Sequence, residues 1–253
     1  MKLKTATLFF VFSFLSLSKI FAQSITKDSC IFTPMFTFSY SYQIPGANLA
    51  DRFGDNSNIG FNFLIKTNKN WIAGVDFNYL FGGKIKENNI FDSISTSSGE
   101  IIDGNGMIAD IKLYERGFYT SVKFGKIFPV LSSNKNSGIM LIGSVGLLQH
   151  KIRIEVTDNV APQLKDDYKK GYDRLTNGLG ISEFVGYAYL GNSRTANFFA
   201  GIEFTQAWTQ CRRDFNFDTM QKDTSKRLDL LYGIKVGWII PLYKRQVSEF
   251  YYY

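Results

Sequence analysis

The chain has few cysteines, few prolines, and no long hydrophobic run beyond its N-terminus. Its 253 residues include two cysteines, five prolines and one histidine. Two cysteines exclude a disulfide-rich secreted scaffold. The mean hydropathy is −0.09 although 45% of the residues are hydrophobic, so the apolar residues are dispersed. We therefore expect no membrane-spanning helix after the N-terminus.

The N-terminal run predicts export from the cytoplasm. Two lysines precede the apolar stretch Leu8–Leu17, and the small residue Ala22 follows it, so residues 1–22 are typical of a secretory signal peptide. A membrane anchor is the alternative, but the run is too short to span comfortably. Removing the three lysines of this segment lowers the net charge from +7 to +4, which gives no nucleic-acid-binding footprint. Residues 23–30 would then form a periplasmic N-terminal segment.

Eight later segments alternate apolar with small or polar residues, which is the period of a β-strand. Each is long enough to cross the hydrocarbon at a tilt, which takes about 9–11 residues. Short and long connections alternate, as in outer-membrane barrels with periplasmic turns and extracellular loops. We predict an all-β fold, an eight-stranded antiparallel up-and-down transmembrane β-barrel with long extracellular loops over residues 31–243. The expected strands are Ile31–Ile44, Asn58–Thr67, Trp71–Gly83, Phe118–Val130, Ile139–Ile154, Leu179–Leu190, Phe198–Cys211 and Leu228–Tyr243.

The last of these segments carries a closing-strand pattern, a polar residue followed by glycine and alternate hydrophobics: Lys235, Gly237, Ile240 and Leu242. With the signal peptide and the architecture, this pattern resembles the small OmpA- and OmpX-type outer-membrane barrels, particularly the short barrels of the Bacteroidetes. The resemblance implies the outer membrane of a Gram-negative bacterium, with loops extracellular and both termini periplasmic. It implies function weakly, because this architecture hosts adhesins, structural anchors, lipid-modifying enzymes and machine subunits. The chain departs from the family habit because residues 244–253 follow the closing strand.

Four charged residues fall on the inward parity at mid-strand, on neighbouring strands. Asp76 and Lys123 belong to the third and fourth segments, and Glu203 and Lys235 to the seventh and eighth. An ion gate or binding site is one interpretation. The other, which we favour, is a salt-bridged plug, because eight strands leave an interior filled by side chains and an unpaired buried charge is destabilising. We therefore expect charge pairs with a structural role and no open channel.

His150 is the only candidate for a catalytic base. A small-barrel lipid hydrolase needs a serine nucleophile, a histidine base and an orienting acid. Ser144 lies six residues upstream, although a loop serine could still complete a triad. We expect His150 to be a lumen or rim residue, and we expect no enzyme activity, no cofactor and no metal. The segment Asp103–Gly106 resembles part of a calcium loop, but its spacing favours a hairpin tip.

Three further features leave alternatives open. Glu183 falls on the apolar parity, so either a bulge shifts its strand or it lies above the lipid. The long loops carry exposed aromatics that could dock a partner or cover the barrel mouth. The tail residues Phe250, Tyr251, Tyr252 and Tyr253 could bind a periplasmic or membrane partner, or pack at the barrel rim.

Cys30 and Cys211 fall at opposite ends of the predicted barrel. The ends should lie about 30 Å apart, far beyond the reach of a disulfide, so we predict two free thiols.

The sequence thus favours a non-enzymatic outer-membrane barrel that acts by protein contacts, plausible as an accessory subunit of an outer-membrane assembly or secretion machine. Its expected partners are outer-membrane lipid and a larger outer-membrane or periplasmic protein complex, and no nucleic acid. A lipid-modifying or lipid-binding barrel and a stand-alone structural or adhesin-like barrel are the alternatives.

Overall fold

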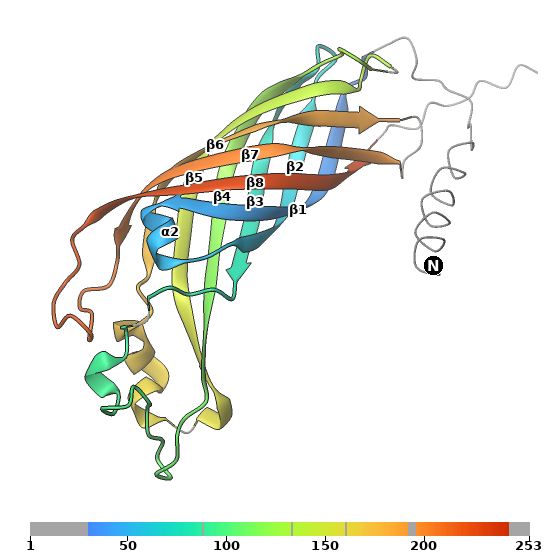
Figure 1. Cartoon of the computed structure of the whole chain (residues 1–253). Coiled ribbons are helices and arrows are strands. Elements are labelled where there is room, and N and C mark those ends of the chain that lie inside the picture. The colour runs from blue at the N-terminus through green and yellow to red at the C-terminus, as the bar shows by residue number, and fades with distance from the viewer. Residues whose placement is uncertain (1–29, 88, 133, 160, 192–195, 243–253) are drawn as a thin grey trace, which may run out of the picture.

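A closed antiparallel β-barrel forms the body of the protein (Figure 1). The computed structural model describes residues 30–242 apart from 88, 133, 160 and 192–195. Each strand pairs with the next, and the last pairs with the first, which confirms the predicted eight-stranded up-and-down barrel. The strands are β1 (Thr33–Ala47), β2 (Asn56–Lys66), β3 (Trp71–Gly82), β4 (Ile111–Phe128), β5 (Gly138–Val156), β6 (Thr176–Leu190), β7 (Asn197–Cys211) and β8 (Lys226–Pro241).

The observed strand bounds differ most from the prediction in β4. This strand begins at Ile111, whereas we expected a loop to continue to Gly117. Glu115 interrupts the apolar alternation, yet its side chain is buried and accepts a hydrogen bond of 3.0 Å from Asn56 Nδ2. The partner that keeps this carboxylate inside lies far away in the sequence, so the local pattern did not reveal the strand. The predicted signal peptide and the tail at 244–253 lie outside the described residues.

The two ends of the barrel are built differently. Connections of four to nine residues, 67–70, 129–137 and 191–196, join strands at one end, which we call the turn end. Segments 48–55, 83–110, 157–175 and 212–225 gather at the other, the loop end (Figure 1). The loop end holds the short helical elements: α2 (Asn48–Arg52), η1 (Asp92–Ile94), η2 (Thr157–Asn159), η3 (Pro162–Leu164) and η4 (Asp166–Gly171). No helix among the described residues is long and apolar enough to cross a membrane.

The register fixes how steeply the strands tilt. Following paired residues around the barrel from Phe36 on β1 returns to Gly46 on the same strand, ten residues further along. For eight strands that stagger corresponds to a tilt of about 40°.

The interior is packed in layers. At the turn end an apolar layer lies inside the barrel, and a second apolar layer closes the loop end. The turn-end layer also explains why β8 has a glycine at position 237. The ring of Phe199 on β7 lies over Gly237 on β8, and a Cβ on this glycine would stand 2.3 Å from that ring. Residues of the turn-end layer are Met35, Leu64, Ile72, Ile127, Met140, Ile142, Phe184, Ala188, Leu190, Phe199 and Ile239.

Both cysteines are free thiols, which confirms that prediction. Cys211 ends β7 at the loop end and is buried, whereas Cys30 precedes β1 at the turn end.

Candidate functional site

The middle layer of the barrel interior holds the four charged residues singled out from the sequence. Lys123 Nζ lies 2.8 Å from Asp76 Oδ2, and Lys235 Nζ lies 2.7 Å from Glu203 Oε1. All four side chains are buried. Asn78 joins the two pairs, because it donates a hydrogen bond of 2.5 Å to Asp76 and lies 3.4 Å from Lys235 Nζ. The two cations and two anions thus form one neutral, hydrogen-bonded network.

This charged layer is enclosed along the barrel axis. Below it lies the apolar layer of the turn end, and the cavity between the two has a volume of about 20 Å³, room for roughly one water molecule. At the turn end itself Lys66 closes the floor, donating hydrogen bonds to Asn136 Oδ1 at 2.8 Å and to the Ile31 carbonyl at 2.9 Å. The apolar floor was not predicted from the sequence. Its signal was the presence of Leu64 and Ile239 on inward parities that we expected to be small or polar.

At the loop end His150 lies inside the barrel mouth. Its Nε2 is 2.9 Å from Asp229 Oδ2, and the same carboxylate oxygen accepts a hydrogen bond of 2.6 Å from the Thr209 hydroxyl. The ring of Phe53 packs edge-on against the imidazole at 5.4 Å between centroids. His150 is 1% exposed. The Asp229 carboxylate therefore links the imidazole to the Thr209 hydroxyl, and the imidazole is enclosed by protein in this structure.

A cluster of ion pairs ties the loops over this mouth. Arg52 of α2 pairs with Glu87 in the segment 83–110, and Arg174 in 157–175 pairs with the same carboxylate at 3.2 Å. Arg174 also pairs with Asp218 in 212–225. In the same loops, the hydrogen bond from Arg213 to Asp173 raises the pKa of the guanidinium. Four separate segments are thus fastened to each other by charge.

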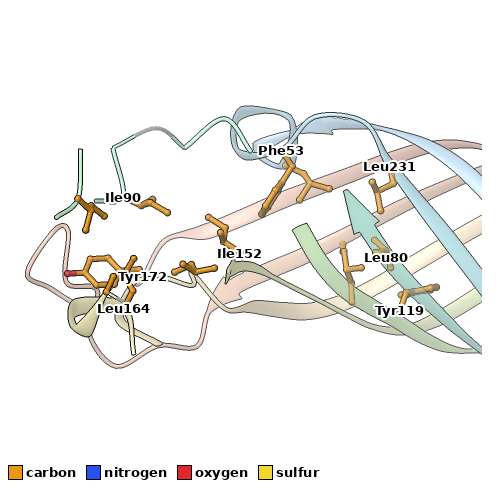
Figure 2. Packing of buried hydrophobic residues seen from close by; sticks show 14 residues of the cluster. Phe53, Leu80, Ile90, Tyr119, Ile152, Leu164, Tyr172 and Leu231 are labelled. Carbon is orange, nitrogen blue, oxygen red and sulfur yellow. The ribbon is translucent and has the colours of Figure 1, made fainter. Parts of the chain in front are cut away.

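The same loops share a hydrophobic cluster that continues into the loop end of the barrel (Figure 2). In its outer part Tyr172 contacts two other aromatic rings, with ring centroids 5.6 Å from Phe91 and 5.4 Å from Phe217. Leu164 of η3 belongs to the same cluster. Ile152 of β5 also belongs to it, because β4 and β5 extend past the other strands toward the loops. Of the two roles left open for the loop aromatics, these residues therefore cover the mouth.

The hairpin tip at Asp103–Gly106 belongs to the same loop assembly. Its Asp103 carboxylate accepts hydrogen bonds from the backbone of Asn105 at 2.7 Å and Met107 at 2.9 Å. Gly106 has a φ of +81°, and Ile102 bridges Ile108 across the turn. The Asp103 carboxylate therefore accepts its hydrogen bonds from within the turn itself. The described residues contain no group of acids, histidines or cysteines arranged to hold a metal.

The outer wall of the barrel is continuous and apolar. Large hydrophobic side chains on every strand face away from the interior and are exposed. Aromatic side chains gather near both edges of this wall, as they do at the two interfaces of a bilayer. Trp71, Phe128, Tyr187, Tyr189, Phe198 and Trp238 lie toward the turn end, and Tyr79, Phe81, Phe118 and Trp208 toward the loop end.

Glu183 is an exception in this wall. The pairing of β6 with β5 and β7 runs without a break through Glu183, and the side chain is exposed between Ile181 and Val185. The bulge that we offered as one explanation is therefore absent. Tyr187 lies four positions from Glu183 in one direction and Leu179 four positions in the other, so Glu183 lies mid-wall and not beyond an edge.

Three of the four closing-strand residues lie on β8, and the fourth, Leu242, follows the strand, which ends at Pro241 and not at Tyr243 as expected. Lys235 and Gly237 point inward on β8, Ile240 lies near its end, and the Leu242 amide donates a hydrogen bond of 2.8 Å to the Pro34 carbonyl of β1. The tail residues Phe250, Tyr251, Tyr252 and Tyr253 lie outside the described residues.

No protein-family model and no curated protein sequence matches the chain. Among solved structures it is similar to Ail, the attachment invasion locus protein of Yersinia pestis, at 9% identity and a TM-score of 0.40, over 82% of this chain and 98% of that one. Neisserial surface protein A is similar at 12% identity and a TM-score of 0.40, over 82% and 96%. The outer membrane protein OprG of Pseudomonas aeruginosa follows at 10% identity and a TM-score of 0.32, over 85% and 97%.

Proposed function

We propose that the chain is a sealed, non-enzymatic outer-membrane barrel that acts through protein contacts, as an accessory subunit of an outer-membrane assembly or secretion machine. The observation that carries the proposal is the pairing of an apolar wall with a filled interior. Soluble monomers rarely expose apolar patches beyond a few hundred Å². This wall surrounds the whole barrel, so a bilayer is the solvent that suits it.

The filled interior supports a role in contacts. The network of Asp76, Lys123, Glu203 and Lys235 satisfies its own charges, and the layers on either side leave no continuous path through the described barrel. A conducting pore or a ligand chamber needs open interior volume, which eight strands rarely leave. The surfaces available for function are therefore the wall and the loop end.

The direction of insertion is part of the proposal, with the loop end outside the cell and the turn end in the periplasm. Two single-cysteine variants test it in a background where Cys30 and Cys211 are replaced by serine. Met107→Cys lies at the loop end and Lys69→Cys at the turn end. A membrane-impermeant maleimide should label Met107→Cys in intact cells, and Lys69→Cys only after the outer membrane is permeabilised. The reverse pattern would overturn this orientation.

Extraction tests the contact role. The full chain is crosslinked in cells, extracted in mild detergent and separated by native electrophoresis, and the associated proteins are identified by mass spectrometry. We expect the barrel in a species larger than the monomer, with defined outer-membrane or periplasmic companions. A solitary barrel that still shows the heat-modifiable migration of a folded barrel would contradict the proposal.

A further inference from the structure

Glu183 stands without a partner in the middle of the apolar wall. On β5 its neighbour is Gly143, which leaves open space beside the carboxylate, since only one backbone oxygen lies within 4 Å of where a Cβ would stand. On β7 its neighbour is Phe204. Within the described chain no hydrogen bond or ion pair satisfies the Glu183 side chain. An ionisable group in this position is unfavourable in hydrocarbon and is expected to pair.

The cations of the wall are too far along the strands to serve. Lys126 lies two residues from the turn end of β4. The other outward cations of β4 and β5 all lie toward the loop end: Lys112, Arg116, Lys151 and Arg153. Glu183 is at mid-depth, seven residues from the end of β6. The unpaired carboxylate therefore calls for a cation supplied by another molecule.

A second copy of the chain does not supply that cation. Copies related by an axis along the membrane normal keep every residue at its own depth. Glu183 of one copy would then meet the apolar wall or the Glu183 of its partner, and two carboxylates in a low dielectric repel each other. Charge complementarity instead selects a partner with a lysine or arginine facing lipid at mid-membrane.

We infer that the wall formed by β5, β6 and β7 around Glu183 is the docking surface for a second membrane-spanning protein whose own wall presents a lysine or arginine at mid-depth. The open space over Gly143 admits the partner's side chain, because small residues allow close approach within a membrane. Gln206 also faces outward, two residues along β7 from Phe204, and adds an amide that can hydrogen-bond to the same partner. This inference rests on the proposed membrane location and specifies where contact is made.

The test uses two matched photocrosslinking positions in the full chain, expressed in its own cells. Benzoylphenylalanine replaces Phe204 on β7, beside Glu183, or Phe61, which faces outward at mid-strand on β2. Strand β2 lies four strands from the β6 strand of Glu183, on the opposite wall. The probe at Phe204 should yield a protein adduct, and the probe at Phe61 should yield none. The crosslinked partner peptide should be a membrane strand with an outward lysine or arginine.

Charge changes then test the chemistry of the contact. Glu183→Gln preserves the shape of the side chain and should reduce the adduct strongly, and Glu183→Lys should abolish it. Replacing the partner's cation by glutamate should restore the adduct of Glu183→Lys. Heat-modifiable migration verifies that each variant is folded, since an outward substitution leaves the barrel interior unchanged.

The other outcomes overturn the inference. These are an adduct of twice the chain's mass, adducts with lipid alone, equal adducts from both walls, a partner strand without a cation, or an adduct indifferent to Glu183→Gln. If the barrel still extracts with companions while the Phe204 probe is silent, the contact role stands and this docking surface fails. If neither occurs, both fail.

Discussion

Replacing Lys235 by methionine tests whether the charged layer holds the barrel together. The change keeps most of the side chain's volume and removes the cation 2.7 Å from Glu203 Oε1. It leaves the Glu203 carboxylate buried without a counter-ion. Removing one partner of a buried pair costs about 3–5 kcal/mol, because the other charge is left desolvated. We expect Lys235→Met to lower the free energy of unfolding by about that amount.

The double variant separates pairing from polarity. Lys235→Met combined with Glu203→Gln removes both charges, and replacing a whole buried pair is often neutral. Its free energy of unfolding should lie close to that of the unmodified protein, so the double-mutant cycle should yield a coupling energy at least as large as the cost of Lys235→Met, about 3–5 kcal/mol. As a matched control, Lys112→Met removes an exposed lysine 3.4 Å from Asp110 and should change stability by less than about 0.5 kcal/mol.

Urea unfolding from lipid vesicles measures these differences. Trp71, Trp208 and Trp238 all lie exposed on the outer wall, so their fluorescence reports loss of contact with lipid. The reasoning is refuted if Lys235→Met costs less than about 1 kcal/mol, or if the double variant is as unstable as the single one.

Three further predictions concern a glycine of β8, a loop carboxylate and a buried thiol. Gly237→Ala should destabilise the barrel in the same urea assay, because the new Cβ would lie 2.3 Å from the Phe199 ring, and Phe199→Leu should relieve part of the loss. The pKa of Asp110 lies below its ordinary value of 3.8, because the Thr157 hydroxyl donates a hydrogen bond to its carboxylate and Lys112 lies nearby. This tie between the two loops is therefore present above pH 3.8 and is lost as the pH falls through the lower pKa of Asp110 in the folded protein. Carboxyl NMR should show that midpoint, and Thr157→Val should move it upward; an unchanged midpoint would contradict the assignment. The buried Cys211 thiol should react with maleimide only after unfolding, and rapid labelling of the folded barrel would show that the loop end opens.

The outward and inward parities of the barrel could be predicted from the sequence because a strand's period is two. Asp76 and Lys235, for example, were assigned to the interior from their immediate neighbours alone, and both are buried. The antiparallel order of sequential strands then brought complementary charges onto adjacent strands. Such predictions succeed where local alternation and chain order determine the contact.

What the sequence did not reveal depends on distant contacts. The start of β4 is stabilised by Asn56, 59 residues before Glu115, and the loop cover is stabilised by Arg52 and Arg174, which share Glu87 from a third segment. No local pattern encodes such pairs. The loop aromatics looked equally suited to a partner or to the mouth, because only the fold shows that Tyr172 packs between two of them.

The charged groups inside the barrel and the carboxylate in its wall differ in how they are paired. Inside, the four central charges pair among themselves, and His150 and Asp229 pair beneath Phe53. A group already paired and enclosed has little capacity left for a ligand or a substrate. Glu183 has the opposite character, since it faces outward at mid-depth with no counter-charge among the described residues. A barrel whose four central charges pair among themselves, and whose apolar wall carries an exposed carboxylate at mid-depth, is suited to the lateral contact proposed above.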